Sequence, residues 1–257
     1  MPATPRQHFN QDIARASSII THAAGLPAAP AAVAVRDDIL RSAWMLAVGA
    51  MDAYFCDAYV AVVVLTLRAK SIQASVDVPP FIRSIRLPIG SMLAAYANRP
   101  NWRWRMAVRQ MMERDSVLSL TRIRDLFNPF FRTGHKFFID QIDTWINRPN
   151  ATAHLFGITA ANYGLTVGAA RQTARKAANA HLMTRLNALI QRRHDCIHNC
   201  DRPRNALQAV GAPGSIRNVL RDVRFLVENA DDHIEDEFER FLHRIGSNAV
   251  TRNAVGY

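Results

Sequence analysis

The sequence has little lysine, although it is strongly basic. Lysine occupies only three positions, Lys70, Lys136 and Lys176, so arginine supplies nearly all of the 32 basic residues. The net charge is +11 and the isoelectric point is about 10.5. Arginine suits bidentate contact with phosphate, so this charge fits a nucleic-acid ligand. A solvated basic surface explains the charge equally well, and a GC-rich genome would enrich alanine and arginine together.

Cysteine is also scarce, and its number is odd. Cys56, Cys196 and Cys200 argue against a disulfide framework and favour a reducing compartment. The N-terminus has early charges and no apolar segment typical of a secretory signal. The longest uncharged apolar stretch within a helical pattern, residues 58–67, is too short to span a bilayer. We therefore expect a soluble cytoplasmic protein.

Glycine and proline are sparse, with 11 and 12 residues, and no segment alternates clearly between apolar and polar positions. These features predict an all-α fold. The pattern predicts three parts: an N-terminal helix with an Ala/Pro linker, a helical domain and a C-terminal tail. They cover residues 1–35, 36–245 and 246–257. Long helices are expected over residues 10–23, 36–69, 167–199 and 215–245, with shorter helices between residues 80 and 145.

The stretch RRHDCIHNC, residues 192–200, ends the third long helix and concentrates reactive side chains. At about 100° per residue, His194 and His198 share one face of the helix, and Cys196 and Cys200 share another. The two pairs point in nearly opposite directions, so they cannot all bind one zinc ion unless the helix unwinds. The two histidines alone could still hold a metal with ligands from elsewhere in the chain. A nucleophilic cysteine is disfavoured for the same reason, because its base would lie on the far side.

The position of these residues on the helix favours a third interpretation. An apolar stripe passes through Leu182, Leu186, Ile190 and Ile197. By the same helical geometry, Arg193 lies about 40° from Ile197, and the two histidines lie about 60° and 100° to its other side. An arginine is therefore expected almost on the buried stripe, with histidines along its edge. The competing interpretation is structural, because arginine and histidine commonly neutralise the dipole at a helix C-terminus.

Three stretches together resemble the HEPN family. R-H-D-C-I-H at 193–198 is similar to the family motif of arginine, a polar residue, a spacer and histidine. HLFGITAANYGLTV followed by LNALIQRRHDCIHN is similar to the RiboL-PSP branch, whose early helix resembles SAWMLAVGAMDAYFCDAYV at 42–60. Arg192 also fits the spacing, but Arg193 is followed by a polar residue, as in the motif. No tyrosine follows His198, unlike the branch whose motif tyrosine is modified by a nucleotidyltransferase.

The resemblance implies a HEPN-like bundle of long antiparallel helices with helical insertions. It implies a metal-independent endoribonuclease without a cofactor, in which the RNA 2′-hydroxyl attacks the neighbouring phosphate. His198 would be the base, Arg193 would stabilise the developing charge, and His194 would orient the phosphate or act as the acid. The resemblance also implies a homodimer with two motifs facing one cleft, acting as a toxin or anti-phage effector with an antitoxin or defence-system partner.

Four residues are expected to support this set: Asp52, Arg192, Asp195 and Asn199. Asp52 would be buried against Arg193 and orient it, although it would equally fit a polar helix face. Two other classes of function stay open. One is a non-catalytic HEPN scaffold that binds RNA or a protein through the same surface, and the other is a helical adaptor without a nucleic-acid role.

Residues 99–136 contain nine basic residues against three acidic ones. Arginines interleaved with tryptophans suit an RNA-contacting surface, although tryptophans more often belong to a core. The candidate RNA-binding residues are Arg99, Trp102, Arg103, Arg105 and Arg109. Near the C-terminus, DDHIEDEFE at 231–239 places His233 and Glu237 four residues apart. We interpret that segment as a solvated acidic face.

Overall fold

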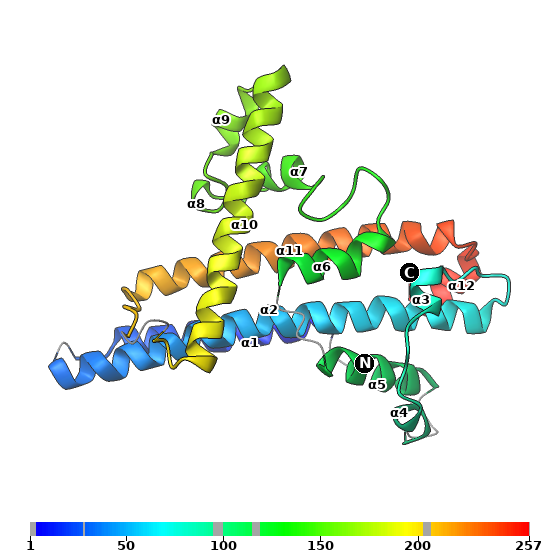
Figure 1. Cartoon of the computed structure of the whole chain (residues 1–257), viewed down its shortest axis with the longest axis horizontal. Coiled ribbons are helices and arrows are strands. Elements are labelled where there is room, and N and C mark those ends of the chain that lie inside the picture. The colour runs from blue at the N-terminus through cyan, green and yellow to red at the C-terminus, as the bar shows by residue number, and fades with distance from the viewer. Residues whose placement is uncertain (1–3, 28, 95–99, 115–118, 203–206, 257) are drawn as a thin grey trace. The chain divides into compact units, whose positions relative to one another are not determined.

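The computed structural model of the chain describes residues 4–27, 29–94, 100–114, 119–202 and 207–256 (Figure 1). Every regular element in those ranges is a helix, so the expected all-α class is confirmed. In chain order the elements are α1 (Pro5–Ala24), α2 (Pro30–Ile72), α3 (Pro80–Arg83), α4 (Ile89–Ala94), α5 (Pro100–Arg114), α6 (Leu120–Phe127), the 3-10 helix η1 (Asn128–Phe130), α7 (Ile142–Ile146), α8 (Ala153–Phe156), α9 (Ala160–Gly164), α10 (Gly168–His198), α11 (Pro213–Arg244) and α12 (Ala249–Val255).

The chain divides into two compact units, and each unit combines two separate stretches of sequence. The first unit contains residues 1–54 and 138–229, and the second contains residues 55–137 and 230–257. The two longest helices, α2 and α11, contribute residues to both units. The motif helix α10 belongs entirely to the first unit.

Several helices begin at residues outside the ranges expected from the sequence, because local signals set these boundaries. α1 starts five residues earlier than expected, because Thr4 accepts from the Gln7 amide and the Gln7 side chain accepts from Thr4 in return. α2 starts inside the Ala/Pro linker at Pro30, since proline is tolerated in the first helical turn. The expected C-terminal tail contains α12, which Asn248 caps by accepting from Thr251.

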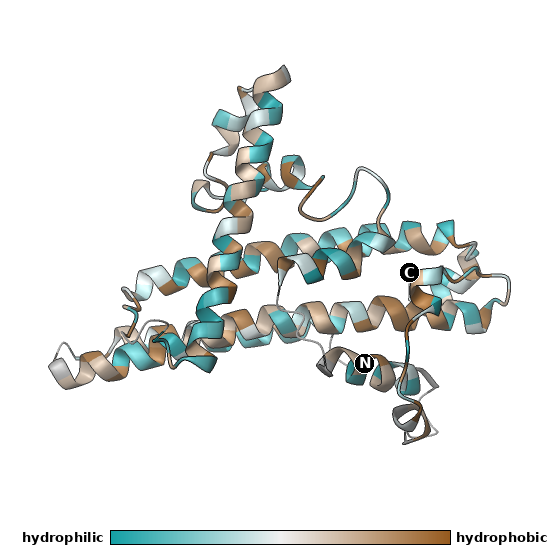
Figure 2. Ribbon diagram, viewed as in Figure 1, coloured by the Kyte–Doolittle hydropathy of each residue, from teal (hydrophilic) through white to brown (hydrophobic). Residues whose placement is uncertain are grey.

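α2 is the most apolar long helix of the chain, and Figure 2 shows apolar residues along much of its length. By length and composition it could cross a membrane, which the sequence pattern did not predict. However, 67% of its most apolar window is buried in the fold, as in the core helix of a soluble protein. Its 43 residues place Asp52 beside α10 in the first unit.

The core of the first unit fixes the register of α10 against its neighbours. The buried residues of α10 are Ala178, Leu182, Leu186, Leu189 and Ile190, together with the carboxylate Asp195. The indole of Trp44 donates to the Leu189 carbonyl at 3.3 Å, which ties α10 to α2. Arg185 pairs with the buried Asp222 of α11 at 2.8 Å. These contacts hold the C-terminal half of α10, where the motif lies.

The second unit has an aromatic core. Phe130 lies at its centre, with ring centroids 5.0 Å from Phe81 and 4.9 Å from Phe241, both edge to face. Phe131 and Phe137 pack in the same manner at 4.8 Å. Edge-to-face pairs of this kind add to the free energy gained from area burial alone.

Candidate functional site

The last turn of α10 is closed by its own backbone. The amides of Asn199 and Asp201 both donate to the Asp195 carbonyl, at 3.0 and 2.9 Å. Cys200 and Asp201 have positive φ angles of 48° and 60°, so the chain turns left-handed directly after the helix. This turn fixes the end of α10 and brings the Asp201 side chain into the interior, where 1% of the residue is exposed.

A buried ion cluster uses Arg192 and not Arg193. Asp201 Oδ2 accepts from Arg192 Nη2 at 2.7 Å and from Arg41 Nε of α2 at 2.8 Å. Arg41 Nη2 also donates to the Gln208 carbonyl at 2.9 Å. The Arg192 guanidinium lies 5.4 Å from the centre of a Trp44 ring. Arg192 is therefore occupied in holding the end of α10 against α2 and the segment that follows.

In the last turns of α10 the buried face includes Asp195 and not Ile197. The predicted apolar stripe is therefore wrong at Ile197. Asp195 is 8% exposed and accepts from the Gln191 and Gln208 side chains, whereas Ile197 is 47% exposed. The physical reason is the segment beginning at residue 207, which folds back over this end of α10 and covers the side that carries Asp195. Asn199 is exposed beyond the last turn.

The three expected catalytic side chains lie in the last two turns of α10, but they do not share one face. The His194 and His198 rings stack with centroids 5.3 Å apart and an interplanar angle of 26°. His194 and Arg193 are half-buried, and His198 is exposed. The two imidazoles are thus together on an accessible side of α10, whereas Arg193 lies about 140° around the helix from His198, near Asp52.

Asp52 faces this turn from α2. Burial raises the pKa of the Asp52 carboxyl, and the charge of Arg193 opposes part of that rise. Asp52 Oδ1 is buried and has no hydrogen-bond partner in the part of the chain that the structure describes. A buried acceptor without a hydrogen bond favours a nearby cation. Asp52 of α2 and Arg193 of α10 therefore attract each other.

Metal ligands do not gather here. Within the described ranges, no group of three or more histidine, cysteine, aspartate or glutamate side chains is placed to hold a metal ion. Burial, with a smaller contribution from Asp201, raises the pKa of the Cys196 thiol, which makes a thiolate nucleophile harder to form. The arrangement therefore offers acid–base and electrostatic groups of histidine and arginine.

The candidate RNA-binding residues of the second unit have mixed exposure. Arg99 lies outside the described residues. Trp102 and Arg105 are half-buried on α5, whereas Arg103 and Arg109 are exposed. Arg109 pairs with the buried Asp57 at 3.3 Å, so part of its charge is already neutralised. The surface of α5 therefore keeps some positive charge, but its arginines do not form a continuous basic stripe.

Glu237 forms a cluster that the sequence did not predict, and the interpretation of 231–239 as a uniformly solvated face is wrong. Only 2% of its side chain is exposed, and Arg132 Nη2 donates to it at 2.6 Å. His135 Nδ1 lies 3.2 Å from the same carboxylate oxygen. Burial alone would raise the Glu237 pKa, but the hydrogen bonds and charge of Arg132 outweigh it and lower the pKa. Burial lowers the pKa of the neighbouring His233.

We compared the chain with protein-family models, with curated proteins and with solved structures, and none of them matches. The resemblance to the HEPN family therefore depends on the motif residues themselves and on the helical context described above.

Proposed function

We propose that the chain is a metal-independent endoribonuclease of the HEPN type, whose catalytic residues are Arg193, His194 and His198. One observation supports this most strongly. The residues around the motif that could compete for its roles, Arg192 and Asp195, are engaged in buried structural contacts. The two histidines stack on an accessible side of α10, and the remaining arginine, Arg193, is half-buried near Asp52.

The proposed reaction follows from the chemistry of these groups. His198 takes the proton of an RNA 2′-hydroxyl, whose oxygen then attacks the adjacent phosphorus. Arg193 stabilises the negative charge that develops on the phosphate oxygens. His194 gives a proton to the departing 5′-oxygen. The products are a 2′,3′-cyclic phosphate on one fragment and a 5′-hydroxyl on the other, and DNA is inert because it has no 2′-hydroxyl.

The biological setting is proposed on the same basis. A growth-arresting toxin or anti-phage effector fits a soluble, cytoplasmic homodimer with an antitoxin or defence-system partner. The burial of α2 supports solubility. A non-catalytic HEPN scaffold is the alternative, and it would bind RNA or a protein through the same face without cutting.

The test is RNA cleavage by the purified protein in the presence of EDTA. We expect cleavage with cyclic phosphate ends, and a loss of at least about 10²-fold in His198→Ala, the usual contribution of a positioned acid or base. His22→Ala, which removes another exposed histidine of the first unit, is the matched control and should cleave at the wild-type rate. Activity that EDTA abolishes and a divalent ion restores would refute the mechanism. Binding of RNA without cleavage would favour the scaffold.

A further inference from the structure

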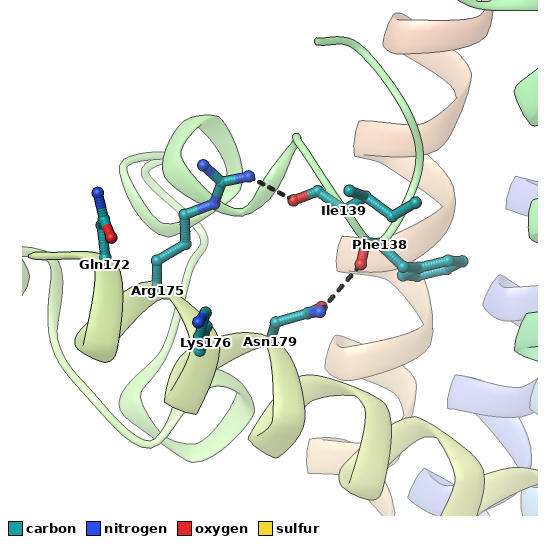
Figure 3. Close-up of a pocket in the computed structure, with 6 residues that line it drawn as sticks. All are labelled: Phe138, Ile139, Gln172, Arg175, Lys176 and Asn179. Carbon is teal, nitrogen blue, oxygen red and sulfur yellow. Dashed lines mark hydrogen bonds between the residues drawn. The ribbon is translucent and has the colours of Figure 1, made fainter. Parts of the chain in front are cut away.

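The helix α10 is anchored to other segments in both of its halves, by different kinds of contact. In the N-terminal half, Asn179 and Arg175 donate to the carbonyls of Phe138 and Ile139, at 2.9 and 2.7 Å, and line an open pocket of about 420 Å³ (Figure 3). These donors lie at least fifteen residues before the motif histidines, which is about 23 Å along an α-helix. They therefore act far from the proposed catalytic residues.

Asp201 anchors the C-terminal end of α10 through both its side chain and its backbone. Its Oδ2 atom accepts from Arg192 of α10 and from Arg41 of α2, at 2.7 and 2.8 Å. Its amide donates to the Asp195 carbonyl, and its own carbonyl accepts from the Gln208 amide, both at 2.9 Å. Asp201 therefore joins α10, α2 and the segment that contains Gln208 at one point.

The conformation and burial of Asp201 fix it firmly at this point. Its φ angle is 60°, in the left-handed region that disfavours most side chains but is tolerated by aspartate and asparagine. Only 1% of the residue is exposed, so its carboxylate depends on the two guanidinium groups that bind it. A residue in such a conformation persists where the surrounding contacts over-determine its position.

His198 depends on this turn for its own position. It is the last residue of α10 and stands three residues before Asp201. Its side chain is exposed, and among the residues that the structure describes its ring contacts only His194 and makes no hydrogen bond. The backbone of the last turn therefore decides where the imidazole lies. Arg193, in contrast, is half-buried near Asp52 and is placed by α2 as well as by α10.

We propose that Asp201 is a positioning residue of the reaction, which holds His198 where it can take the proton of the 2′-hydroxyl. The carboxylate does not touch the substrate. It ties the turn to α2, so that the imidazole stays in one place relative to the rest of α10. This role rests on the proposed function, which assigns His198 as the base. The effect on rate should be large, because a misplacement of about 1 Å in an active site can cost about 10²-fold.

The first experiment observes the ring of His198 and needs no RNA cleavage. In a heteronuclear NMR spectrum of protein labelled at its histidine ring carbons, the His198 signal is the one that His198→Ala removes. Asp201→Gly keeps the left-handed turn, because glycine adopts positive φ angles freely, but it removes the carboxylate. This variant should shift or broaden the His198 signal. Asp222→Ala, the matched control, removes another buried carboxylate that binds an arginine of α10, Arg185, and should leave the signal unchanged.

The second experiment measures RNA cleavage by variants whose circular dichroism shows them to be folded. Asp201→Gly should lower kcat by about 10–10²-fold and leave KM within about twofold, because the bridge acts on the reacting geometry and not on binding. Asp201→Asn should keep most of kcat, since an amide oxygen in the place of Oδ2 can accept from both arginines and asparagine tolerates the turn. Asp222→Ala should keep the wild-type kcat.

If Asp201→Gly does not fold, Arg41→Gln replaces it in both experiments. It removes only the bond to α2, leaves Asp201 paired with Arg192, and should lower kcat without raising KM. An unchanged His198 signal, or an equal loss of kcat in Asp222→Ala, would overturn the positioning role. A wild-type protein that does not cleave RNA, but whose His198 signal moves in Asp201→Gly, refutes the nuclease alone. Cleavage with an unchanged His198 signal refutes the positioning role alone.

Discussion

Two adjacent arginines at the end of α10 have different surroundings. Consecutive residues on a helix point about 100° apart, so one of them can face the interior while the other stays on an accessible side. Arg192 reaches the buried Asp201, and Arg193 lies on the side of Asp52. The family motif by itself leaves both arginines possible, and their contacts provide a physical basis for separating them.

We predict that Arg192→Ala loses stability and Arg193→Ala loses activity. Asp201 keeps its bond to Arg41, so removal of Arg192 should lower the free energy of unfolding by about 1–3 kcal/mol, the cost of one charged hydrogen bond. Urea denaturation measures this quantity. RNA cleavage measured on the same samples should be abolished only in Arg193→Ala. A stable, inactive Arg192→Ala protein would reverse the assignment.

Asp52 provides a prediction about pH. Because burial raises its pKa above the ordinary value of 3.8, folding favours the neutral carboxyl of Asp52 over its carboxylate. The stabilising contribution is complete below that ordinary value and is lost as the pH rises through the raised pKa. Asp52→Asn, which mimics the neutral carboxyl, should therefore gain stability relative to wild type between pH 4 and neutrality. Melting temperatures across that range would measure it, and a constant difference would contradict the prediction.

At the scale of elements, the short helix α8 depends on one glycine. Gly157 ends α8 with a φ angle of 72°, and a Cβ atom there would lie 3.0 Å from the His181 ring. Gly157→Ala should lower the free energy of unfolding by about 1–2 kcal/mol, the cost of a left-handed residue with a side chain. Gly164→Ala in the neighbouring α9 is the control, because nothing lies within 4 Å of its Cβ position. Chemical denaturation should show little change there.

In the second unit, Glu237 of α11 allows a test of how much a buried ion pair contributes to stability. The Arg132 side chain and backbone amide donate to the buried Glu237, so Glu237→Gln should cost about 2–3 kcal/mol of stability at neutral pH. The lowered pKa means that this contribution is present above the ordinary value of 4.5 and is lost as the pH falls through the lowered value. Glu239→Gln, exposed on the same helix, should be neutral. Equal melting temperatures of both variants would contradict the prediction.

The helices with strong periodicity could be predicted, and the ion clusters could not. The expected range 167–199 nearly coincides with α10, because its apolar spacing and its boundaries are local signals. The burial of Asp195 and Asp201 depends on the segment beginning at residue 207 folding back, which no local pattern encodes. Likewise, Glu237 stands four residues from His233 in an acidic stretch, and only the position of Arg132 in space makes it interior.

At the scale of the whole molecule, the proposed reaction needs groups on both sides of one phosphate. One motif supplies a narrow helical edge, so we predict a homodimer in which two copies of His194, Arg193 and His198 meet across a two-fold axis. The exposed Ile197 beside them offers apolar surface for such a contact.

Light scattering at assay concentration should give the dimer mass. In mixtures of His198→Ala with Arg193→Ala protein, RNA cleavage should vary with the mixing ratio, because mixed dimers differ from both parents. A fully active monomer would exclude the shared site.

The two compact units also constrain how such a chain could have originated. Neither is a contiguous stretch of sequence, and the boundaries at residues 54 and 229 fall inside the two longest helices. A single cut of the chain therefore cannot separate the units, and a cut at residue 54 or 229 would also sever a helix. Two ready-made domains joined end to end would not give this arrangement, because each unit needs two separate stretches of the chain.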